Sequence, residues 1–468
     1  MAVGNGAPGA AAKAIVVLAS LLLLRGCADG PRAAHPGPRT SAVGARSLAT
    51  RPRTTARAED PAWTTYQGSQ SRWGSFPEPE VTGLRPAWTT PALDGAVYAQ
   101  PIWQSGRAYI ATENDTVYAI SLATGRIIWR RHLGTPVPLR QLPCGDIDPL
   151  GITGTPVIAG GRLYVAAEVQ PAEQRLFALD LLTGAVVWSS GLDLPGTHAY
   201  AQQQRGALTY LGGTVYVPLG GLYGDCGPYV GQVVAVRPGQ GVFAYRVPTA
   251  REGAIWATAG MSVGPGGDLY AATGNSASDG PWDGGDSVLR LSPSLKLQGY
   301  FAPRDFARLN LQDLDLGSTA PLPLPGGLLF QIGKEGVGYL LRARDLGGVG
   351  HAVASGAVCA GAYGGDAYQG GLVYVPCTDG LAALRLGPQS FSVAFRAGGF
   401  DAGPPVVGGG AVFTVDEGRG RLDVLSASSG HLLAEAPLGD VPHFDSPALA
   451  PGLVLVPAGH AVKAFSLR

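Results

Sequence analysis

The chain has 468 residues, of which 46% are hydrophobic and only 15% are charged, with 71 glycines and 38 prolines. Basic and acidic residues number 34 each, so the formal net charge is zero, which argues against nucleic acid or another polyanion as the main partner. A chain of this length and hydrophobic content can bury an ample core, and the composition is typical of a compact exported β-protein.

The first residues have the pattern of an export signal. Lys13 precedes an apolar stretch of eleven residues, 14–24, which is too short to span a bilayer but suits the core of a signal peptide. The segment 24–27 (Leu-Arg-Gly-Cys) resembles a bacterial lipobox, although Arg25 departs from the small or apolar residue usual there. We therefore expect an exported protein, anchored to the outside of the cell membrane by lipidation of Cys27. Ordinary cleavage and secretion are the alternative.

Residues 28–61 are rich in Ala, Pro, Gly and Arg and lack apolar periodicity. Such a segment cannot bury enough apolar surface to fold, so the composition predicts a disordered tether. Residues 1–27 then form the signal segment, and residues 62–468 form the folded domain.

A repeated pattern follows the tether. Its clearest copies, residues 117–129 and 176–188, run from an alternating strand through Thr-Gly into an aliphatic run that ends in tryptophan. Because each unit is a small sheet that buries its faces only by stacking on its neighbours, the repeat predicts an all-β fold, an eight-bladed β-propeller with four-stranded antiparallel blades. The eight units start near Tyr98, Thr153, Arg205, Ala257, Ser318, Tyr363, Gly403 and Ser446.

The last unit has room for only three strands before Arg468. The segment from Leu84 to Thr90 can supply the fourth, and Trp88 then occupies the place of the repeat's terminal tryptophan. We expect this N-terminal strand to pair with the C-terminal unit, because such pairing closes the ring and removes an open sheet edge.

The blade pattern, with Thr-Gly-x-x-x-Trp after Tyr-Ala-Ile or Phe-Ala-Leu, resembles the pyrroloquinoline-quinone (PQQ) type propeller repeat. Quinoprotein alcohol dehydrogenases share this repeat with the BamB-like assembly lipoproteins, which bind no quinone. The resemblance covers about Trp63 to Arg468. A narrower likeness, to exported bacterial propellers of this class, rests on GDCGPYVGQVVAV from Gly224 and GKEGVGYLL from Gly333. The resemblance implies the fold but leaves the function open, because one scaffold serves enzymes and interaction proteins alike.

Four cysteines remain besides Cys27, namely Cys144, Cys226, Cys359 and Cys377. An even number in an exported chain favours disulfides. Strand order places all four on the face that holds the loops between blades and between middle strands. Cys359 with Cys377 closes a single blade, which pairs Cys144 with Cys226. A zinc site is the alternative, but no Cys-x-x-Cys spacing supports it.

Strand order sorts the other loops into two unequal faces. One face has tight turns such as Gly212-Gly213, whereas the other has long irregular segments, among them 141–150, 222–229, 275–285 and 303–316. Binding sites usually lie on long loops of a rigid scaffold, so we expect the functional site on this loop-rich face.

Polar and aromatic residues of these loops are the candidates for ligand binding. Arginine and lysine suit a carboxylate, phosphate or quinone acid, and clustered carboxylates with asparagine suit a hard cation such as calcium. The alternative is that these groups only stabilise turns and join blades through ion pairs. The candidates are Arg205, Asp225, Trp256, Asn275, Asp313, Asp315, Lys334, Glu335 and Asp366.

We expect two of these residues, Arg205 and Lys334, to lie near the propeller axis as the cationic part of a pocket for an anionic group. Trp256 would form an apolar wall of that pocket. Asp313 or Asp315 would hold the arginine in place.

The sequence contains no hydrolase or phosphate-loop motif, and its seven histidines are scattered. The resemblance implies, for an alcohol dehydrogenase, a quinone held between a tryptophan and a ring of two adjacent cysteines, beside a calcium ion and a catalytic aspartate. This chain has neither adjacent cysteines nor a Cys-x-x-Cys-His haem segment. We therefore assign no catalytic residue, metal ligand or cofactor, and expect a monomeric binding or assembly module for a protein, a glycan or a small ligand. The alternative is a dehydrogenase of alcohols or polyols that depends on PQQ and calcium.

Overall fold

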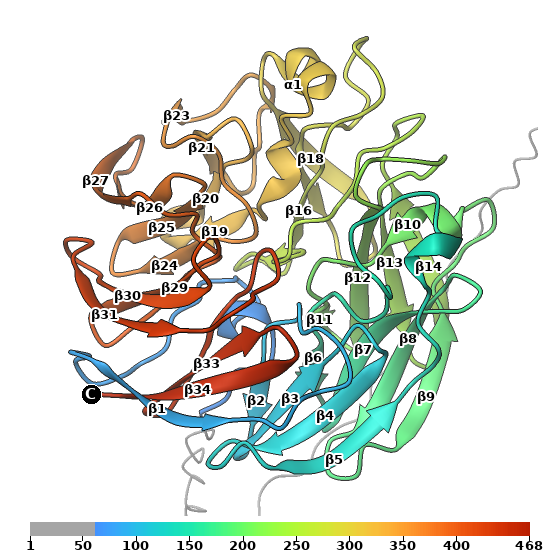
Figure 1. Cartoon of the computed structure of the whole chain (residues 1–468). Coiled ribbons are helices and arrows are strands. Elements are labelled where there is room, and N and C mark those ends of the chain that lie inside the picture. Colours follow the sequence, from blue (N-terminus) through green and yellow to red (C-terminus); the bar gives the residue numbers. More distant parts are fainter. Residues whose placement is uncertain (1–60) are drawn as a thin grey trace, which may run out of the picture. The chain divides into compact units, whose positions relative to one another are not determined.

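Short strands joined by Gly-rich turns assemble into eight small sheets that form the ring of a propeller (Figure 1), as expected. The computed structural model describes residues 61–468. The expected signal segment, Cys27 and the tether up to residue 60 lie outside the described residues. Within residues 61–468, no helix has the length and apolar character that crossing a membrane requires.

The first four blades follow one another along the chain, each with its first strand nearest the axis. Blade 1 consists of β2 (Ile102–Gln104), β3 (Arg107–Ala111), β4 (Thr116–Ser121) and β5 (Ile127–His132). Blade 2 consists of β6 (Val157–Ala159), β7 (Arg162–Val169), β8 (Glu173–Asp180) and β9 (Val186–Gly191). Blade 3 consists of β10 (Gln202–Gln203), β11 (Thr209–Leu211), β12 (Thr214–Gly221), β13 (Gln232–Arg237) and β14 (Gly241–Arg246). Blade 4 consists of β15 (Ser262–Val263), β16 (Leu269–Ala272), β17 (Val288–Leu291) and β18 (Leu297–Ala302), with β22 (Gly348–Val349) added in parallel.

The last four blades repeat this order. Blade 5 consists of β19 (Leu322–Leu324), β20 (Leu328–Gln331), β21 (Val337–Arg342) and β23 (Ala354–Ala357), and blade 6 of β24 (Ala367–Gln369), β25 (Leu372–Cys377), β26 (Gly380–Leu386) and β27 (Phe391–Gly398). Blade 7 consists of β28 (Val406–Gly408), β29 (Ala411–Asp416), β30 (Arg421–Ser426) and β31 (Leu432–Pro437), and blade 8 of β32 (Ala448–Ala450), β33 (Leu453–Ala458), β34 (Ala461–Leu467) and β1 (Leu84–Thr89). The helical elements are α1 (Phe306–Gln312), η1 (Tyr66–Gly68), η2 (Leu139–Gln141), η3 (Ala199–Ala201), η4 (Leu316–Ser318) and η5 (Pro325–Gly327).

The ring closes as the sequence predicts. β1 pairs antiparallel with β34, so that Leu84 lies opposite Leu467 and Thr89 lies opposite Lys463. In Figure 1 the N-terminal strand in blue therefore lies at the rim of the sheet that holds the red C-terminal strands. The pairing leaves β34 with a neighbour on each side.

Trp88 takes the expected role of a blade's terminal tryptophan. Its indole nitrogen donates to the carbonyl of Leu122 at 3.0 Å, and a Cβ added to Gly125 would lie 2.5 Å from its ring. Trp129 of blade 1 contacts blade 2 in the same way, with its ring against Gly184. Each ring therefore covers the Thr-Gly turn of the next blade, where glycine leaves room for it.

The segment that precedes β1 lies against the inner strands of the ring, which the sequence analysis did not foresee. Backbone carbonyls at positions 64, 70, 73 and 74 accept amides of β6, β15, β24 and β28 at 2.7 to 2.8 Å. The Tyr66 hydroxyl lies 2.7 Å from Ser446 and 3.4 Å from Thr258, which belong to linkers on different sides of the ring. This segment therefore occupies the axis and joins blades that do not touch one another.

Arg72 fixes this axial segment. Its side chain is almost fully buried, and its guanidinium donates to the carbonyls of Met261 and Leu208 at 3.0 and 3.1 Å and to the Thr209 hydroxyl at 2.9 Å. None of the carboxylates among residues 61–468 forms an ion pair with it, and burial lowers the pKa of its guanidinium to about 9. Neutral acceptors alone satisfy this buried cation.

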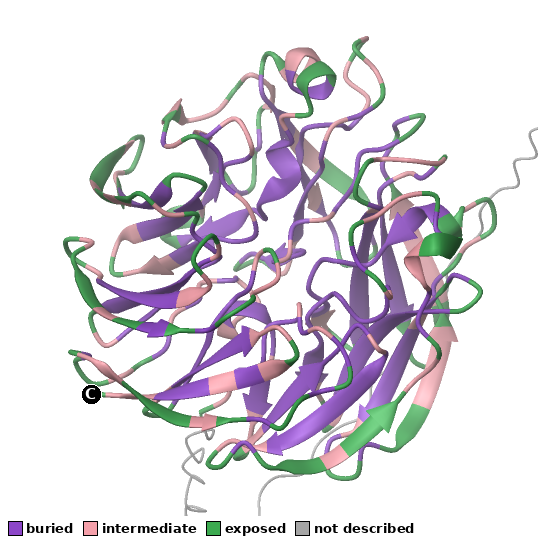
Figure 2. Cartoon of the chain, in the orientation of Figure 1, coloured by how far each residue is buried: buried purple, intermediate pink, exposed green. Residues whose placement is uncertain are grey.

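The core of the domain lies between the faces of neighbouring blades. Figure 2 shows the inner and middle strands buried and the outermost strands largely exposed. The strand β4 is buried along nearly its whole length, whereas β5 at the rim of the same blade is mostly exposed. This gradient is expected where flat sheets stack around an axis.

Both predicted disulfides are present. Cys144 pairs with Cys226 and Cys359 pairs with Cys377, with Cα atoms 6.2 and 6.0 Å apart. The first bond joins the linker between blades 1 and 2 to the middle loop of blade 3, and the second joins the linker between blades 5 and 6 to the end of β25 in blade 6. Disulfides persist in oxidising compartments, so they are compatible with the expected export.

Replacing Cys359 and Cys377 together by serine is expected to lower the free energy of unfolding by about 2 to 4 kcal/mol, because the bond closes a loop of moderate length. Urea unfolding of the variant beside the wild type measures this loss. Non-reducing peptide mapping of protein from the cell envelope should recover the two peptides joined. Recovery of both as free thiols would contradict the prediction.

Candidate functional site

Three aromatic side chains from distant linkers meet on the loop-rich face. Trp256 lies between blades 3 and 4, Tyr363 between blades 5 and 6, and Phe444 between blades 7 and 8. The ring centre of Trp256 lies 6.2 Å from each of the other two, which stack on one another at 5.5 Å. Because the linkers of Trp256 and Phe444 belong to opposite sides of the ring, their side chains can meet only near the axis.

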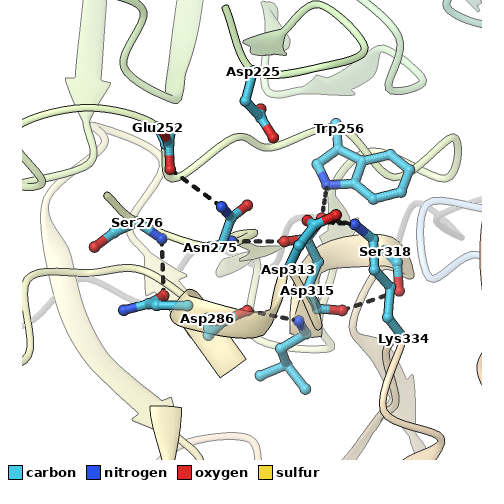
Figure 3. A network of polar contacts seen from close by, with 12 residues as sticks. Asp225, Glu252, Trp256, Asn275, Ser276, Asp286, Asp313, Asp315, Ser318 and Lys334 are labelled. Atoms are coloured by element: carbon cyan, nitrogen blue, oxygen red, sulfur yellow. Dashed lines mark hydrogen bonds and ion pairs between the residues drawn. The ribbon is translucent and has the colours of Figure 1, made fainter. Parts of the chain in front are cut away.

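Asp315 is the centre of a polar network beside Trp256 (Figure 3). One carboxylate oxygen accepts the Trp256 indole N–H at 3.1 Å and faces the Lys334 ammonium at 2.9 Å. The other oxygen accepts the backbone amide of Asn275 at 2.8 Å. With 5% of its side chain exposed, Asp315 joins three separate segments of the loop-rich face in a nearly dry environment.

The loop that carries Asp313 and Asp315 is held from its own side. Asp313 ends α1 in a left-handed conformation, with φ of 53°, which aspartate tolerates better than most residues. The buried carboxylate of Asp286 accepts the Leu316 amide at 2.8 Å, and the Ser318 hydroxyl donates to the Asp315 carbonyl at 3.1 Å. These contacts fix the direction in which the two aspartates point.

A glycine lets Lys334 approach this loop. A Cβ at Gly333 would lie 2.3 Å from the backbone oxygen of Asp315, so a larger residue would push the two loops apart. The Lys334 ammonium also lies 2.7 Å from an oxygen of Asp313 and 5.6 Å from the ring centre of Trp256. Burial opposes the charged form, but the two carboxylates outweigh it, so the pKa of Lys334 lies above its ordinary value.

Two further carboxylates border the network. The Asn275 side-chain amide donates to Glu252 at 3.1 Å, and Glu252 also pairs with Arg251 at 2.6 Å. The hydroxyl of Tyr229 donates to Asp225. Burial raises the pKa of the Asp225 and Glu252 carboxyls, and the negative charges of the neighbouring aspartate loop add to the rise.

The network has more negative than positive groups. Four carboxylates, Asp225, Glu252, Asp313 and Asp315, face only two cations, Lys334 and Arg251. The surplus of carboxylates, together with the side chain of Asn275, suits a hard cation. Within residues 61–468, the one group of three Cys, Asp or Glu side chains close enough to share an ion is Cys359, Cys377 and Asp379, whose cysteines form a disulfide. A cation in the network would therefore complete its coordination with a ligand or with water.

The structure corrects the expected environment of Arg205. Arg205 does lie near the axis, because its guanidinium carbon is 5.7 Å from the ring centre of Phe444. Its carboxylate partner, however, is Asp146 at 3.6 Å, and the aspartates that were expected to hold it pair with Lys334. The two cations therefore do not form one cationic pocket. The loop that carries Asp313 and Asp315 lies against Gly333, so its aspartates pair with the adjacent Lys334 and not with Arg205.

Two other candidates lie apart from the network. Glu335 pairs with Arg308 of α1, as the alternative interpretation of the loop residues expects. Asp366 is fully buried at the start of blade 6, and neither carboxylate oxygen has a hydrogen-bond partner among residues 61–468. Burial raises its pKa well above the ordinary value.

Sequence reasoning missed four residues of this site, Asp146, Glu252, Tyr363 and Phe444. All four lie in linkers between blades, as Trp256 does. A search of every linker for charged and aromatic residues could have found them. It would not have shown which of them meet.

Two hollows of the described surface lie elsewhere. One, of about 460 Å³, lies on the opposite face between blades 1 and 8, and the other, of about 480 Å³, lies at the rim of blade 5. Neither is lined by a residue of the axial network. The candidate site is therefore defined by the convergence of its side chains.

Comparisons with known proteins agree with this architecture. Residues 63–289 match the family model described as outer membrane protein assembly factor BamB. The chain is 29% identical over 198 residues to the quinoprotein ethanol dehydrogenase of Pseudomonas putida, covering 41% of this chain and 29% of that protein. It is 27% identical over 290 residues to quinohemoprotein alcohol dehydrogenase ADH IIB of the same organism, covering 52% and 39%. This chain is a PQQ-like β-propeller.

Solved structures extend the likeness of this PQQ-like propeller to the whole ring. A europium-containing methanol dehydrogenase superposes with a TM-score of 0.70 at 15% identity, covering 87% of this chain and 98% of that one. The quinohemoprotein alcohol dehydrogenase of Comamonas testosteroni gives 0.67 at 17% identity, covering 87% and 81%. Identities this low show the fold alone. The alignments to the two curated relatives span 29% and 39% of their length.

Proposed function

We propose that this PQQ-like propeller oxidises an alcohol at its loop-rich face, with a PQQ-type quinone and a hard cation as cofactors. One observation carries the proposal: near the axis, Asp315 contacts Trp256, Asn275 and Lys334, which come from three separate segments of the chain. An aromatic surface, a carboxylate pair with a lysine, and an amide beside surplus carboxylates are the groups that such cofactors require. The sequence analysis placed this function second, after a binding module.

The network contains the types of side chain that can bind the two cofactors. Trp256 offers an aromatic face over which the Lys334 ammonium lies. Asn275, Glu252 and Asp225 offer oxygen ligands to a hard cation. The chain lacks adjacent cysteines, and its Cys144–Cys226 disulfide instead braces the loop that carries Asp225. When bound, a PQQ-type quinone supplies an acceptor for two electrons, and the cation polarises oxygen atoms near it.

The two aspartates of the α1 loop have different roles in this proposal. Asp315 is nearly buried and saturated with donors, so it positions Trp256 and Lys334. Asp313 has 65% of its side chain exposed and keeps one carboxylate oxygen free of the lysine. Asp313 is therefore the carboxylate that can accept the hydroxyl proton of an alcohol, while Lys334 holds it in place.

Titration of the purified protein with PQQ tests this function. We expect PQQ to quench tryptophan fluorescence in the presence of Ca²⁺ or, in a separate series, of Eu³⁺, because a similar methanol dehydrogenase contains europium. The loaded protein should reduce a dye with ethanol. Asp313→Asn should lose about 100-fold or more in dye reduction and still bind PQQ, since general-base catalysis contributes at least that factor.

Asp305→Asn is the matched control, because Asp305 lies on the same loop and pairs only with exposed Arg308. It should bind PQQ and reduce dye like the wild type. Failure of PQQ to bind with either cation, together with no dye reduction, would overturn the proposal.

A binding or assembly module for another protein is the second candidate. Two large apolar side chains on the loop-rich face favour it, because Tyr223 is 70% exposed and Leu311 is 71% exposed. Exposed aromatic and aliphatic groups near a rigid polar centre are common in protein interfaces.

We propose in addition that the protein is exported. The two disulfides support it, because they persist in oxidising compartments. We also propose that Cys27 carries the lipid anchor and that the protein acts as a monomer.

A further inference from the structure

Arg205 is a buried cation whose donors lack acceptors. Only 9% of its side chain is exposed, and its guanidinium makes no hydrogen bond to any of residues 61–468. Its ion pair with Asp146 is long, at 3.6 Å. Of the other buried cations near the axis, Arg72 has an acceptor for each of its donors, and Lys334 contacts two carboxylates at 2.7 and 2.9 Å. None of its nitrogens belongs to the fully buried side-chain atoms that lack a partner, so the Arg205 donors reach solvent and are open to an added acceptor.

The surroundings of Arg205 leave part of its charge uncompensated. Asp146 is 30% exposed, so water screens its attraction. Burial raises the pKa of the nearby Glu113 carboxyl to about 7, although the charge of Arg205 acts to lower that pKa. A large share of the Glu113 carboxyls is then protonated at neutral pH and carries no charge toward the arginine.

Aromatic rings lie on the other side of the guanidinium. Its carbon is 5.7 Å from the ring centre of Phe444, and Phe444 stacks on Tyr363 with an angle of 12° between the rings. Phe444 in turn lies 6.2 Å from Trp256. Arg205 and the Asp315 network are thus connected by one row of aromatic rings.

We propose that Arg205 binds a carboxylate of the ligand at the axis, with Phe444 and Tyr363 against the organic part of that ligand. A guanidinium presents paired N–H donors that match a carboxylate in a bidentate fashion. The surplus negative charge beyond Trp256 opposes a second anionic charge, so a carboxylate fits better than a phosphate dianion. The inference rests on the proposed function and extends it, because the carboxylate belongs either to the quinone or to a hydroxy-acid substrate.

Binding of trimesate tests the carboxylate site without any redox chemistry. Trimesate is a flat aromatic tricarboxylate, and calorimetric titration at low ionic strength measures its Kd. We expect Arg205→Met to weaken binding about tenfold or more and Arg205→Lys to weaken it less, because lysine keeps the charge but loses the paired donors. Arg140→Met, at an exposed arginine in the linker that also carries Asp146, should stay within about twofold of the wild type.

Circular dichroism and thermal unfolding identify variants that are folded. Equal trimesate affinity of the wild type and a folded Arg205→Met or Arg205→Lys variant would overturn the inference. A wild type that does not bind trimesate at millimolar concentration would also overturn it. If trimesate binding depends on Arg205 while PQQ neither binds nor supports dye reduction, the site stands and the dehydrogenase proposal fails.

Two further measurements distinguish the source of the carboxylate. If it belongs to the substrate, Arg205→Met should lower kcat/KM for 3-hydroxypropanoate relative to 1-propanol by about tenfold, with PQQ affinity unchanged. If it belongs to the quinone, the Kd for PQQ should rise about tenfold and the substrate ratio should stay constant. If neither quantity changes in an active, folded variant, the assignment of Arg205 is wrong.

Discussion

Deletion of residues 84–90 is expected to lower the free energy of unfolding by about 5 kcal/mol or more, because the strand pairs with β34 at five positions and each lost hydrogen bond counts about 1 kcal/mol. The deletion also removes Trp88 from the Thr-Gly turn at Gly125. It also shortens the connection between the axial segment and blade 1 by seven residues. β34 would then have an open edge, which favours aggregation. Thermal unfolding should show a melting temperature lower by about 10 °C or more.

A deletion of residues 30–58 is the matched control. The sequence predicts a tether there, so its removal is expected to leave the melting temperature within about 2 °C of the wild type. Trp88→Ala separates packing from strand pairing and should cost about 3 kcal/mol. Equal melting temperatures for the two deletions would contradict the proposed importance of ring closure.

The Lys334→Met variant is expected to lose about 3 kcal/mol of stability and all dye reduction, because it leaves the nearly buried Asp315 carboxylate without its cation. Asp315 keeps its hydrogen bonds to Trp256 and Asn275, which limits the loss. Urea unfolding measures the change in free energy. If Lys334 only bound a ligand, its replacement would instead leave the free energy of unfolding unchanged.

Removing the unpaired charge should reverse the effect on stability. We expect the double variant Lys334→Met/Asp315→Asn to recover most of the lost free energy, since a neutral amide needs no cation. Asp313→Asn alone should change stability by less than about 1 kcal/mol, because the Asp313 carboxylate is largely exposed. A stable Lys334→Met variant would show that the Asp315 carboxylate does not depend on this cation.

Much of the architecture follows from local patterns in the sequence. Strand alternation and the Thr-Gly turn repeat in each blade, so the number of blades and their order could be counted. Trp88 marks the closing strand because its environment repeats that of Trp129 in the next blade. The cysteine pairs could be chosen because strand order assigns every loop to one of two faces.

The residues of the loop-rich face could be named from the sequence, but their partners could not. Trp256 and Phe444 are separated by half the ring, and Lys334 meets Asp315 because Gly333 permits a close approach of two loops. No periodicity encodes such contacts. They depend on how far each linker extends toward the axis, and therefore the expected pairing of Arg205 with the α1 loop was wrong.

The sequence by itself determined the elements whose partners are near in the chain or repeat at a fixed spacing, namely the blades, their closure and the disulfides. Only the tertiary structure decided how the charges at the axis are shared and where the segment around Arg72 lies. The physical reason is that the axis is the one place where all eight blades approach each other. There the nearest neighbour of a side chain is set by the geometry of the ring, whereas within a blade it is set by the order of residues along the chain.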